Sequence, residues 1–447
     1  MTDSARNRSF RRRTGVACLL AALGGVAGGA HAQCGDWERV GSTNFGEIYA
    51  LAVFDDGTGP ALYASDRYAN YVSYVLRWTG TAWSYIGGFH AGPTGERVNV
   101  FALEALDLGT GPALYAGGEF RVATGGVAAN NVARWDASTG WSPLGDGIAS
   151  HRNQEEVFAL AAFGGLLYAG GAFEERFGNP GNNIARWNGT AWSRLGGGVG
   201  AAWDAVVALE VFNDGSGPAL YVGHSSWHTD FINRWNGSSW SYLGTGTNGM
   251  VRALKVFNDG SGPALYAGGE FGIAGGNPVS NIARWDGSDW SALGSGINGT
   301  VRALAVFDDG TGPALYAAGT FTEAGGNPAS NIARWDGTEW TRLGEGIGAA
   351  WNAVFALEVF DDGSGPSLYA AGRFPQAGGN PVSNIARWVP QPPCRADLNG
   401  DCVLDWRDFF LYLDLFGAGD PIADINGDGV LDADDFFAYL ELFAAGC

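Results

Sequence analysis

The sequence has almost no lysine, few basic side chains overall and, beyond its N-terminal leader, no long apolar run. Lys255 is the only lysine in 447 residues, which argues against lysine-dependent chemistry elsewhere in the chain. Lysine and arginine together number 26, against 46 aspartates and glutamates. This acidic balance disfavours nucleic acid and anionic membrane as partners. No later stretch is long and apolar enough to span a bilayer, so no membrane span is expected.

Recognisable catalytic motifs are also missing. The sequence contains no nucleophile elbow, no phosphate-binding loop and no set of metal ligands of the oxidase type. Among so many acids, no pair of carboxylates stands out as a glycosidase centre. These absences favour a non-catalytic protein over an enzyme.

The first 32 residues have the organisation of a secretory signal peptide. Five arginines precede an apolar run from Val16 to Ala30, which ends in the small-residue site Ala30-His31-Ala32. We expect cleavage before Gln33 and a secreted or cell-surface protein, exported by the general or the twin-arginine route. Cleavage leaves 21 basic and 45 acidic side chains, a net charge of about −24.

Four cysteines remain after cleavage, and an even number in an exported chain favours disulfides. Three pairings are possible for Cys34, Cys394, Cys402 and Cys447. A Cys394–Cys447 bond would join the two ends of the C-terminal segment and is the preferred pairing. The alternative joins Cys34 to Cys394 and leaves Cys402 with Cys447.

The central part of the chain repeats one unit, best seen at residues 301–344. Four short apolar runs, 301–307, 314–321, 331–335 and 340–343, are separated by turn residues such as Asp309-Gly310 and Gly325-Gly326-Asn327-Pro328. We call them runs a, b, c and d. Their lengths and breaks predict a small antiparallel sheet and no helix.

Seven copies of this unit are present, spaced 45 to 53 residues apart. The tyrosines of run b mark them: Tyr63, Tyr115, Tyr168, Tyr221, Tyr266, Tyr316 and Tyr369. Four strands at a period near 50 predict an all-β, seven-bladed β-propeller over residues 33–388. The seventh copy lacks run d, whereas residues 36–41 match a run d with no a, b or c before it. We therefore expect the N-terminal strand to complete the last blade and close the ring.

The repeat resembles the kelch family. Leu-Tyr-Ala-Gly-Gly-Glu-Phe at 114–120 and 265–271, followed by Arg-Trp and a Trp-Ser-x-Leu-Gly strand, is similar to that family's aromatic, double-glycine and tryptophan pattern. The resemblance covers residues 36–388 and implies kelch-like blades. Residues present in every copy, such as Arg334-Trp335, are expected to be structural.

Candidate ligand-binding residues are those at which the copies disagree. The loops from run d into the next run a, and from b into c, should meet on one face of an antiparallel propeller. The outlying residues in these loops are Tyr68, Tyr71, His90, Arg97, His151, Trp203, His224, Trp227, His228 and Trp351. Exposed aromatics among polar neighbours suit a carbohydrate or protein surface; the alternative is loop drift with partly buried tryptophans. A zinc site at His224, His228 and Asp230 is disfavoured because that spacing needs a helix.

Residues 394–447 follow a proline-rich linker, 389–393, and contain two calcium-loop patterns in the same register. Oxygen donors recur at alternating positions, which lets them surround one hard cation each. The expected ligands are Asp397, Asn399, Asp401, Val403, Asp405 and Asp408 in the first loop, and Asp424, Asn426, Asp428, Val430, Asp432 and Asp435 in the second. The valines would contribute main-chain carbonyls. Two calcium ions are therefore predicted.

This duplication resembles the dockerin family, because each loop ends in aspartate and runs into a single amphipathic helix, 408–416 and 435–443. In the first loop Cys402 replaces the glycine usual at position 6. The resemblance implies docking onto a cohesin-like scaffold or cell-surface protein. The sequence thus predicts a non-catalytic binding and display protein, whose propeller recognises an extracellular glycan or protein. The alternative is an exported carbohydrate-active enzyme, a glycosidase or lyase, on the same scaffold.

Overall fold

The computed structural model describes residues 35–69, 71–91, 97–109, 111–148, 155–175, 178–200, 204–225, 231–391, 395–399 and 404–446. The predicted signal peptide and Cys34, Cys394, Cys402 and Cys447 lie outside these residues. None of the helices in the described ranges has the length and apolar character needed to cross a membrane.

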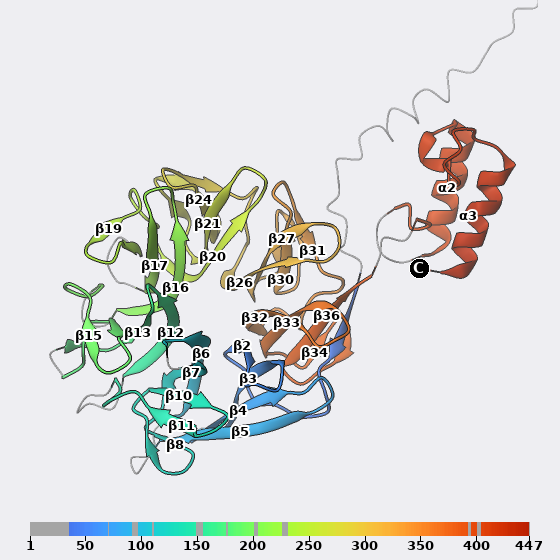
Figure 1. The fold of residues 1–447 in the computed structure, drawn as a ribbon. Helices are drawn as coiled ribbons and strands as arrows, with labels where there is room; N and C mark the ends of the chain where they lie inside the picture. The colour runs from blue at the N-terminus through green and yellow to red at the C-terminus, as the bar shows by residue number, and fades with distance from the viewer. Residues whose placement is uncertain are drawn as a thin grey trace, which may run out of the picture.

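The chain forms a seven-bladed β-propeller, as the repeat period predicted (Figure 1). Each blade has four antiparallel strands. In chain order, the first three blades are β2 (Leu51–Asp55), β3 (Pro60–Ala69), β4 (Val72–Trp78) and β5 (Trp83–His90); β6 (Asn99–Asp107), β7 (Pro112–Glu119), β10 (Val132–Asp136) and β11 (Gly140–Pro143); and β12 (Glu156–Phe163), β13 (Leu166–Ala172), β14 (Ile184–Trp187) and β15 (Trp192–Arg194).

The next three blades repeat this arrangement. They are β16 (Ala205–Asn213), β17 (Pro218–Ser225), β18 (Ile232–Trp235) and β19 (Trp240–Tyr242); β20 (Met250–Asn258), β21 (Pro263–Glu270), β24 (Ile282–Trp285) and β25 (Trp290–Ala292); and β26 (Thr300–Asp308), β27 (Pro313–Thr320), β30 (Ile332–Trp335) and β31 (Trp340–Arg342). The connection from run b to run c, expected as a plain turn, carries a small hairpin of its own in four blades. These hairpins are β8 (Val122–Ala123) with β9 (Val127–Ala128), β22 (Ile273–Ala274) with β23 (Asn277–Pro278), β28 (Glu323–Ala324) with β29 (Asn327–Pro328), and β34 (Gln376–Ala377) with β35 (Asn380–Pro381).

The last blade takes its outermost strand from the beginning of the chain. It consists of β32 (Ala353–Asp361), β33 (Pro366–Arg373), β36 (Ile385–Pro390) and β1 (Gly35–Arg39). Strand β1 pairs antiparallel with β36, which places Trp37 opposite Trp388. The prediction that the N-terminal strand closes the ring is confirmed.

In six of the seven blades the tryptophan of the outer strand links its blade to the blade before it; the exception is Trp141 of the second blade, whose indole Nε1 has no hydrogen-bond partner among the described residues. The indole Nε1 of Trp340 donates to the carbonyl of Leu293 at 3.0 Å, and Trp83, Trp192, Trp240 and Trp290 make the equivalent bond. Trp37 donates in the same way to Leu343 at 3.5 Å, while Val40, just after β1, accepts from Trp83. The N-terminal segment therefore supplies two successive links of the ring.

The Asp-Asp-Gly turns between runs a and b hold the blades together internally. In the sixth blade, Asp309 accepts from the hydroxyl of Tyr316 at 2.8 Å and pairs with Nε of Arg334 at 3.2 Å. The same three residue types meet in the first, fourth, fifth and seventh blades, around Asp56, Asp214, Asp259 and Asp362. Asp308 accepts from the main-chain N–H groups of Gly310 and Gly312, at 2.9 and 3.0 Å. These acids thus stabilise a turn and neutralise an arginine, as expected from turn chemistry.

The end of the chain forms two helices, α2 (Trp406–Ala418) and α3 (Ala433–Ala445), with the 3-10 turn η3 (Pro421–Ala423) between them. Each helix begins two residues earlier than predicted, because Asp405 and Asp432 act as N-caps in capping boxes. Tyr412 and Tyr439, which occupy matching positions in the duplicated sequence, stack face to face with ring centroids 4.0 Å apart. The duplication in sequence is therefore also a pairing in space.

Candidate functional site

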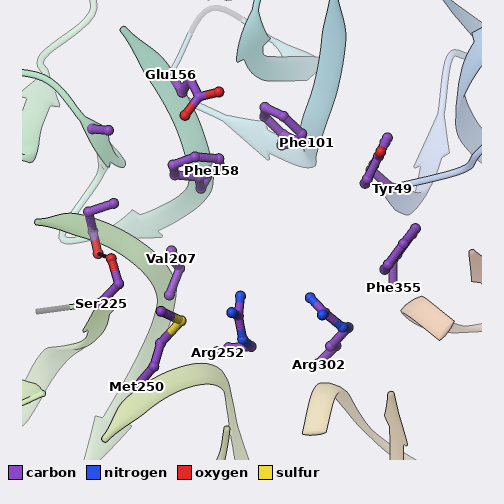
Figure 2. Close-up of a pocket in the computed structure, with 12 residues that line it drawn as sticks. Tyr49, Phe101, Glu156, Phe158, Val207, Ser225, Met250, Arg252, Arg302 and Phe355 are labelled. Atoms are coloured by element: carbon purple, nitrogen blue, oxygen red, sulfur yellow. Dashed lines mark hydrogen bonds between the residues drawn. The ribbon is translucent and has the colours of Figure 1, made fainter. Parts of the chain in front are cut away.

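Six inner strands, together with Tyr49 just before β2, bring one side chain per blade into a pocket at the centre of the propeller (Figure 2). These residues are Tyr49, Phe101, Phe158, Val207, Arg252, Arg302 and Phe355. Further lining residues include Glu156, Ser225 and Met250. The pocket has a volume of about 440 Å³, within the range of small-ligand sites.

A β-bulge explains why these side chains face the channel. In the sixth blade the register between β26 and β27 shifts between Val301 and Ala303, which leaves Arg302 as the extra residue. Five more inner strands shift at the same place and so re-aim the side chains of Phe101, Phe158, Val207, Arg252 and Phe355. Opposite the bulge, a Cβ on Gly319 would lie only 2.0 Å from the carbonyl oxygen of Thr300. Glycine avoids this clash in the sixth blade, whereas the fourth blade keeps the same bulge with His224 at the equivalent position.

One side of the pocket is an arc of aromatic rings from four successive blades. Tyr49 stacks on Phe355 with centroids 4.9 Å apart and planes 11° apart. Phe101 meets Tyr49 edge to face at 5.3 Å and contacts Phe158 at 5.0 Å. The hydroxyl of Tyr49 donates to Glu47, which also pairs with Arg67 at 2.8 Å. Tyr49 is thus fixed in orientation, and burial raises its pKa, so it remains a neutral donor.

The opposite side carries two arginines from adjacent blades. In Figure 2 the guanidinium groups of Arg252 and Arg302 both point into the space bounded by the aromatic arc. Nε of Arg252 donates to Glu270 at 2.8 Å. Arg302 lies 5.7 Å from the ring centre of Phe355, and its buried Nε has no hydrogen-bond partner among the described residues. Burial first, and then the charge of Arg252, lowers the pKa of Arg302.

A carboxyl group completes the pocket. Glu156, on β12, lies across the pocket from the arginines in Figure 2. Burial, and then the charge of Glu119, raises the pKa of Glu156 to about 7. Near neutral pH this group can therefore either donate or accept a hydrogen bond.

A second set of charged side chains lies on the inner strands, each three residues after a residue that lines the pocket. Glu104, Glu210 and Glu358 come from three blades, and Lys255, the single lysine, comes from a fourth. Burial raises the pKa of all three glutamates, and the charges of Glu358 and Glu210 help to raise that of Glu104 to about 7. Lys255 acts in the opposite direction and contributes to lowering the pKa of each glutamate.

This arrangement predicts that Glu104→Gln stabilises the protein at high pH and much less at low pH. A carboxyl whose pKa rises on folding binds more protons in the folded state, so stability falls as pH rises from about 4.5 to about 7. We expect the variant to gain about 1–3 kcal/mol in the free energy of unfolding at pH 8 and little at pH 4.5. Chemical denaturation at the two pH values measures this difference. An equal gain in the free energy of unfolding at both pH values would show that the ionised form of Glu104 does not destabilise the folded protein.

None of the described residues predicted from the loops lines this pocket. Tyr68, Tyr71 and Trp351 are 67%, 58% and 76% exposed, and His90 and Arg97 are exposed as well. His224 differs from the expectation of a surface ligand: it is buried in β17, where its Nε2 lies 2.8 Å from Oδ1 of Asn233. His151, Trp203, Trp227 and His228 lie outside the described residues. Phe101, Phe158, Arg252 and Arg302 were not predicted from the loops, although the seven copies of run a also differ from one another at this position.

The second predicted calcium loop is organised by its last residue. Asp435 is fully buried and accepts from the main-chain N–H groups of Asn426 and Asp432, at 3.2 and 3.0 Å. The N–H of Asp432 is the largest cause of the lowered pKa of Asp435. Asp424 accepts from Gly427 and Gly429, at 2.8 and 2.9 Å. The loop is thus folded around its first and last carboxylates.

The first loop repeats this geometry where it is described. Asp408, also fully buried, accepts from Asn399 and Asp405 at 3.1 and 3.0 Å; Asp401 and Val403 lie outside the described residues. Across the described ranges, no three His, Cys, Asp or Glu side chains are grouped so that they could hold a metal ion. The expected ligand set of the second loop also includes an amide, Asn426, and a main-chain carbonyl, Val430. Those oxygen donors are chemically suited to calcium.

Comparisons with known proteins assign the chain to no family. No family model matches the chain, and no curated protein matches it. Among solved structures, YCF48 from Cyanidioschyzon merolae is 12% identical, with a TM-score of 0.47 over 80% of this chain and 99% of that one. The structure of BBS1N in complex with ARL6DN is also 12% identical, with a TM-score of 0.48 over 80% and 98%. Neither comparison points to the kelch or dockerin families in particular.

Proposed function

We propose that this chain is a secreted, non-catalytic binding protein that takes its ligand into the mouth of the propeller's central channel. The observation that carries the proposal is the pocket itself, which combines an aromatic arc with two inward-facing arginines and a carboxyl group. A concave, mainly apolar site with a few convergent polar groups is typical of ligand binding. The kelch-like repeat pattern does not by itself specify a role, because one fold can carry many functions. The proposal therefore rests on the pocket.

The C-terminal helices would then anchor the protein. The two loops have dockerin-like spacing and each ends in a buried aspartate, Asp408 or Asp435. The proposed anchor binds two calcium ions and docks on a cohesin-like scaffold or cell-surface protein. Binding by the ring and docking by the helices make this a display protein.

A second candidate, an exported carbohydrate-active enzyme, is favoured by one observation. Glu156 has a pKa raised to about 7 and faces the pocket, as a general acid or base would. The described lining residues include no second carboxylate to pair with it, which is what most glycosidases use. Binding without turnover therefore agrees better with the site.

A saccharide and protein array probed with the mature full-length chain tests the proposal. We expect retention of at least one extracellular glycan or protein, without release of shortened or unsaturated products. Product formation that is lost in Glu156→Gln would establish the enzyme instead. Affinity capture from a surface fraction, with and without chelator, tests the anchor separately. Capture that is indifferent to the chelator would contradict calcium-dependent docking.

A further inference from the structure

The pocket gathers two positive side chains in a molecule whose net charge is strongly negative. The chain carries a net charge of −20, yet two arginines from neighbouring blades turn their guanidinium groups into one cavity. Like charges held close together in a partly desolvated space repel each other unless an anion lies between them. Arg252 is balanced by Glu270, at 2.8 Å. Arg302 has no ion pair with any described residue, and its Nε is buried without a hydrogen bond.

The remaining walls specify what else the ligand must carry. The arc of Phe355, Tyr49, Phe101 and Phe158 offers flat apolar contact to a ring. Glu156 and Ser225, by contrast, can satisfy hydroxyl groups. An aromatic acid would leave these polar groups without partners, whereas a sugar has both an apolar C–H face and hydroxyls. A volume of about 440 Å³ holds one to a few sugar rings.

We infer that the pocket binds the anionic unit of an acidic saccharide, with its carboxylate or sulfate held by Arg252 and Arg302 and its ring against the aromatic arc. This assignment rests on the proposed binding function and names its ligand class. Arg302 is the specificity-determining residue, because its guanidinium is the one of the two that makes no ion pair with a described residue. Glu270 remains with Arg252 in the complex, so the positive charge offered to the ligand is that of Arg302, while Glu156 can donate or accept a hydrogen bond across the pocket.

Isothermal titration of the mature full-length chain tests the inference with four probes. They are trigalacturonate, its methyl ester, neutral galactotriose and a sulfated carrageenan tetrasaccharide. We expect one or both acidic probes to bind at least tenfold more tightly than the neutral ones, with an affinity that falls as salt rises. The carboxylated and sulfated probes distinguish the two forms of anion.

Substitution of the arginines provides a second test of the inference. Arg302→Gln is expected to weaken binding of the acidic probe by about tenfold to a hundredfold, because a charge-assisted contact is lost. Arg302→Lys should recover part of the loss. Arg194→Gln removes the same charge from an exposed outer strand and should change nothing. Should Arg302→Gln fail to fold, as judged by its thermal midpoint, Arg252→Gln replaces it.

The outcomes separate the inference from the function on which it rests. Equal affinity for acidic and neutral probes, or an unchanged affinity in Arg302→Gln, would overturn the anionic assignment and leave a neutral-glycan binder. Failure of all four probes, together with retention of a protein on the array, would also overturn it while the binding function stands. Failure of every probe and of the array would overturn both.

Discussion

Replacing Trp37 by alanine is expected to open the propeller at its closing blade and to lower the free energy of unfolding by about 3–5 kcal/mol. Trp37 is only 1% exposed and packs against Trp388 with ring centroids 5.3 Å apart. The substitution also removes the indole donor to Leu343 and loosens the segment whose Val40 accepts from Trp83. Thermal and denaturant unfolding, followed by tryptophan fluorescence, should show an earlier transition. Limited proteolysis should cut the N-terminal strand first.

Trp406 offers a matched control for this experiment. It lies at the start of α2 and is 63% exposed, so Trp406→Ala removes an indole of the same size without opening the ring. We expect the propeller transition of this variant to be unchanged. If Trp37→Ala unfolded at the same denaturant concentration as the parent chain, the pairing of β1 with β36 would not be what closes the ring.

The propeller could be predicted from the sequence because the residues that form each blade recur in seven copies. The tyrosines of run b reveal the period of the repeat. The seventh copy lacks run d, and the segment around Trp37 has the sequence of a run d without the other three runs, which predicted that β1 pairs with β36. The small hairpins, such as β28 with β29, could not be predicted as strands because each arm has only two residues. Their turn at Gly325-Gly326 was recognised, but hydrophobic periodicity cannot be detected over so short a span.

The pocket could not be predicted from the sequence, because it depends on a local feature of the backbone that the hydrophobic pattern does not reveal. Arg302 lies within a uniform Val-x-Ala-Leu segment, and strict alternation along a strand does not reveal that a bulge turns this residue toward the channel. The loops seemed the place for function because their copies differ in length as well as in residue type. His224 shows the opposite error: its departure from glycine suggested a ligand, whereas the side chain is buried against Asn233.

Removing calcium is expected to unfold α2 and α3 while leaving the propeller intact. The helices share a small core centred on the stacked Tyr412 and Tyr439, and so short a segment rarely folds without a metal or a crosslink. If this segment binds two calcium ions, the free energy of binding them contributes to the free energy of folding the two helices. Circular dichroism at 222 nm should therefore fall on chelation, since α2 and α3 are the long helices of the described chain. Calorimetric titration of the metal-free protein should give two ions per chain.

Two neighbouring aspartates make this prediction specific to the loop. Asp435 is fully buried and ties together Asn426 and Asp432, whereas Asp434, one residue earlier, is exposed. Asp435→Ala should abolish one of the two calcium equivalents and weaken the helical signal even in excess calcium, because it removes both a ligand and the loop's internal acceptor. Asp434→Ala, which removes the same charge, should retain both ions. An unchanged helical signal in chelator would mean that hydrogen bonds from Asp408 and Asp435 organise these loops without any metal, and the calcium-dependent anchor would then be wrong.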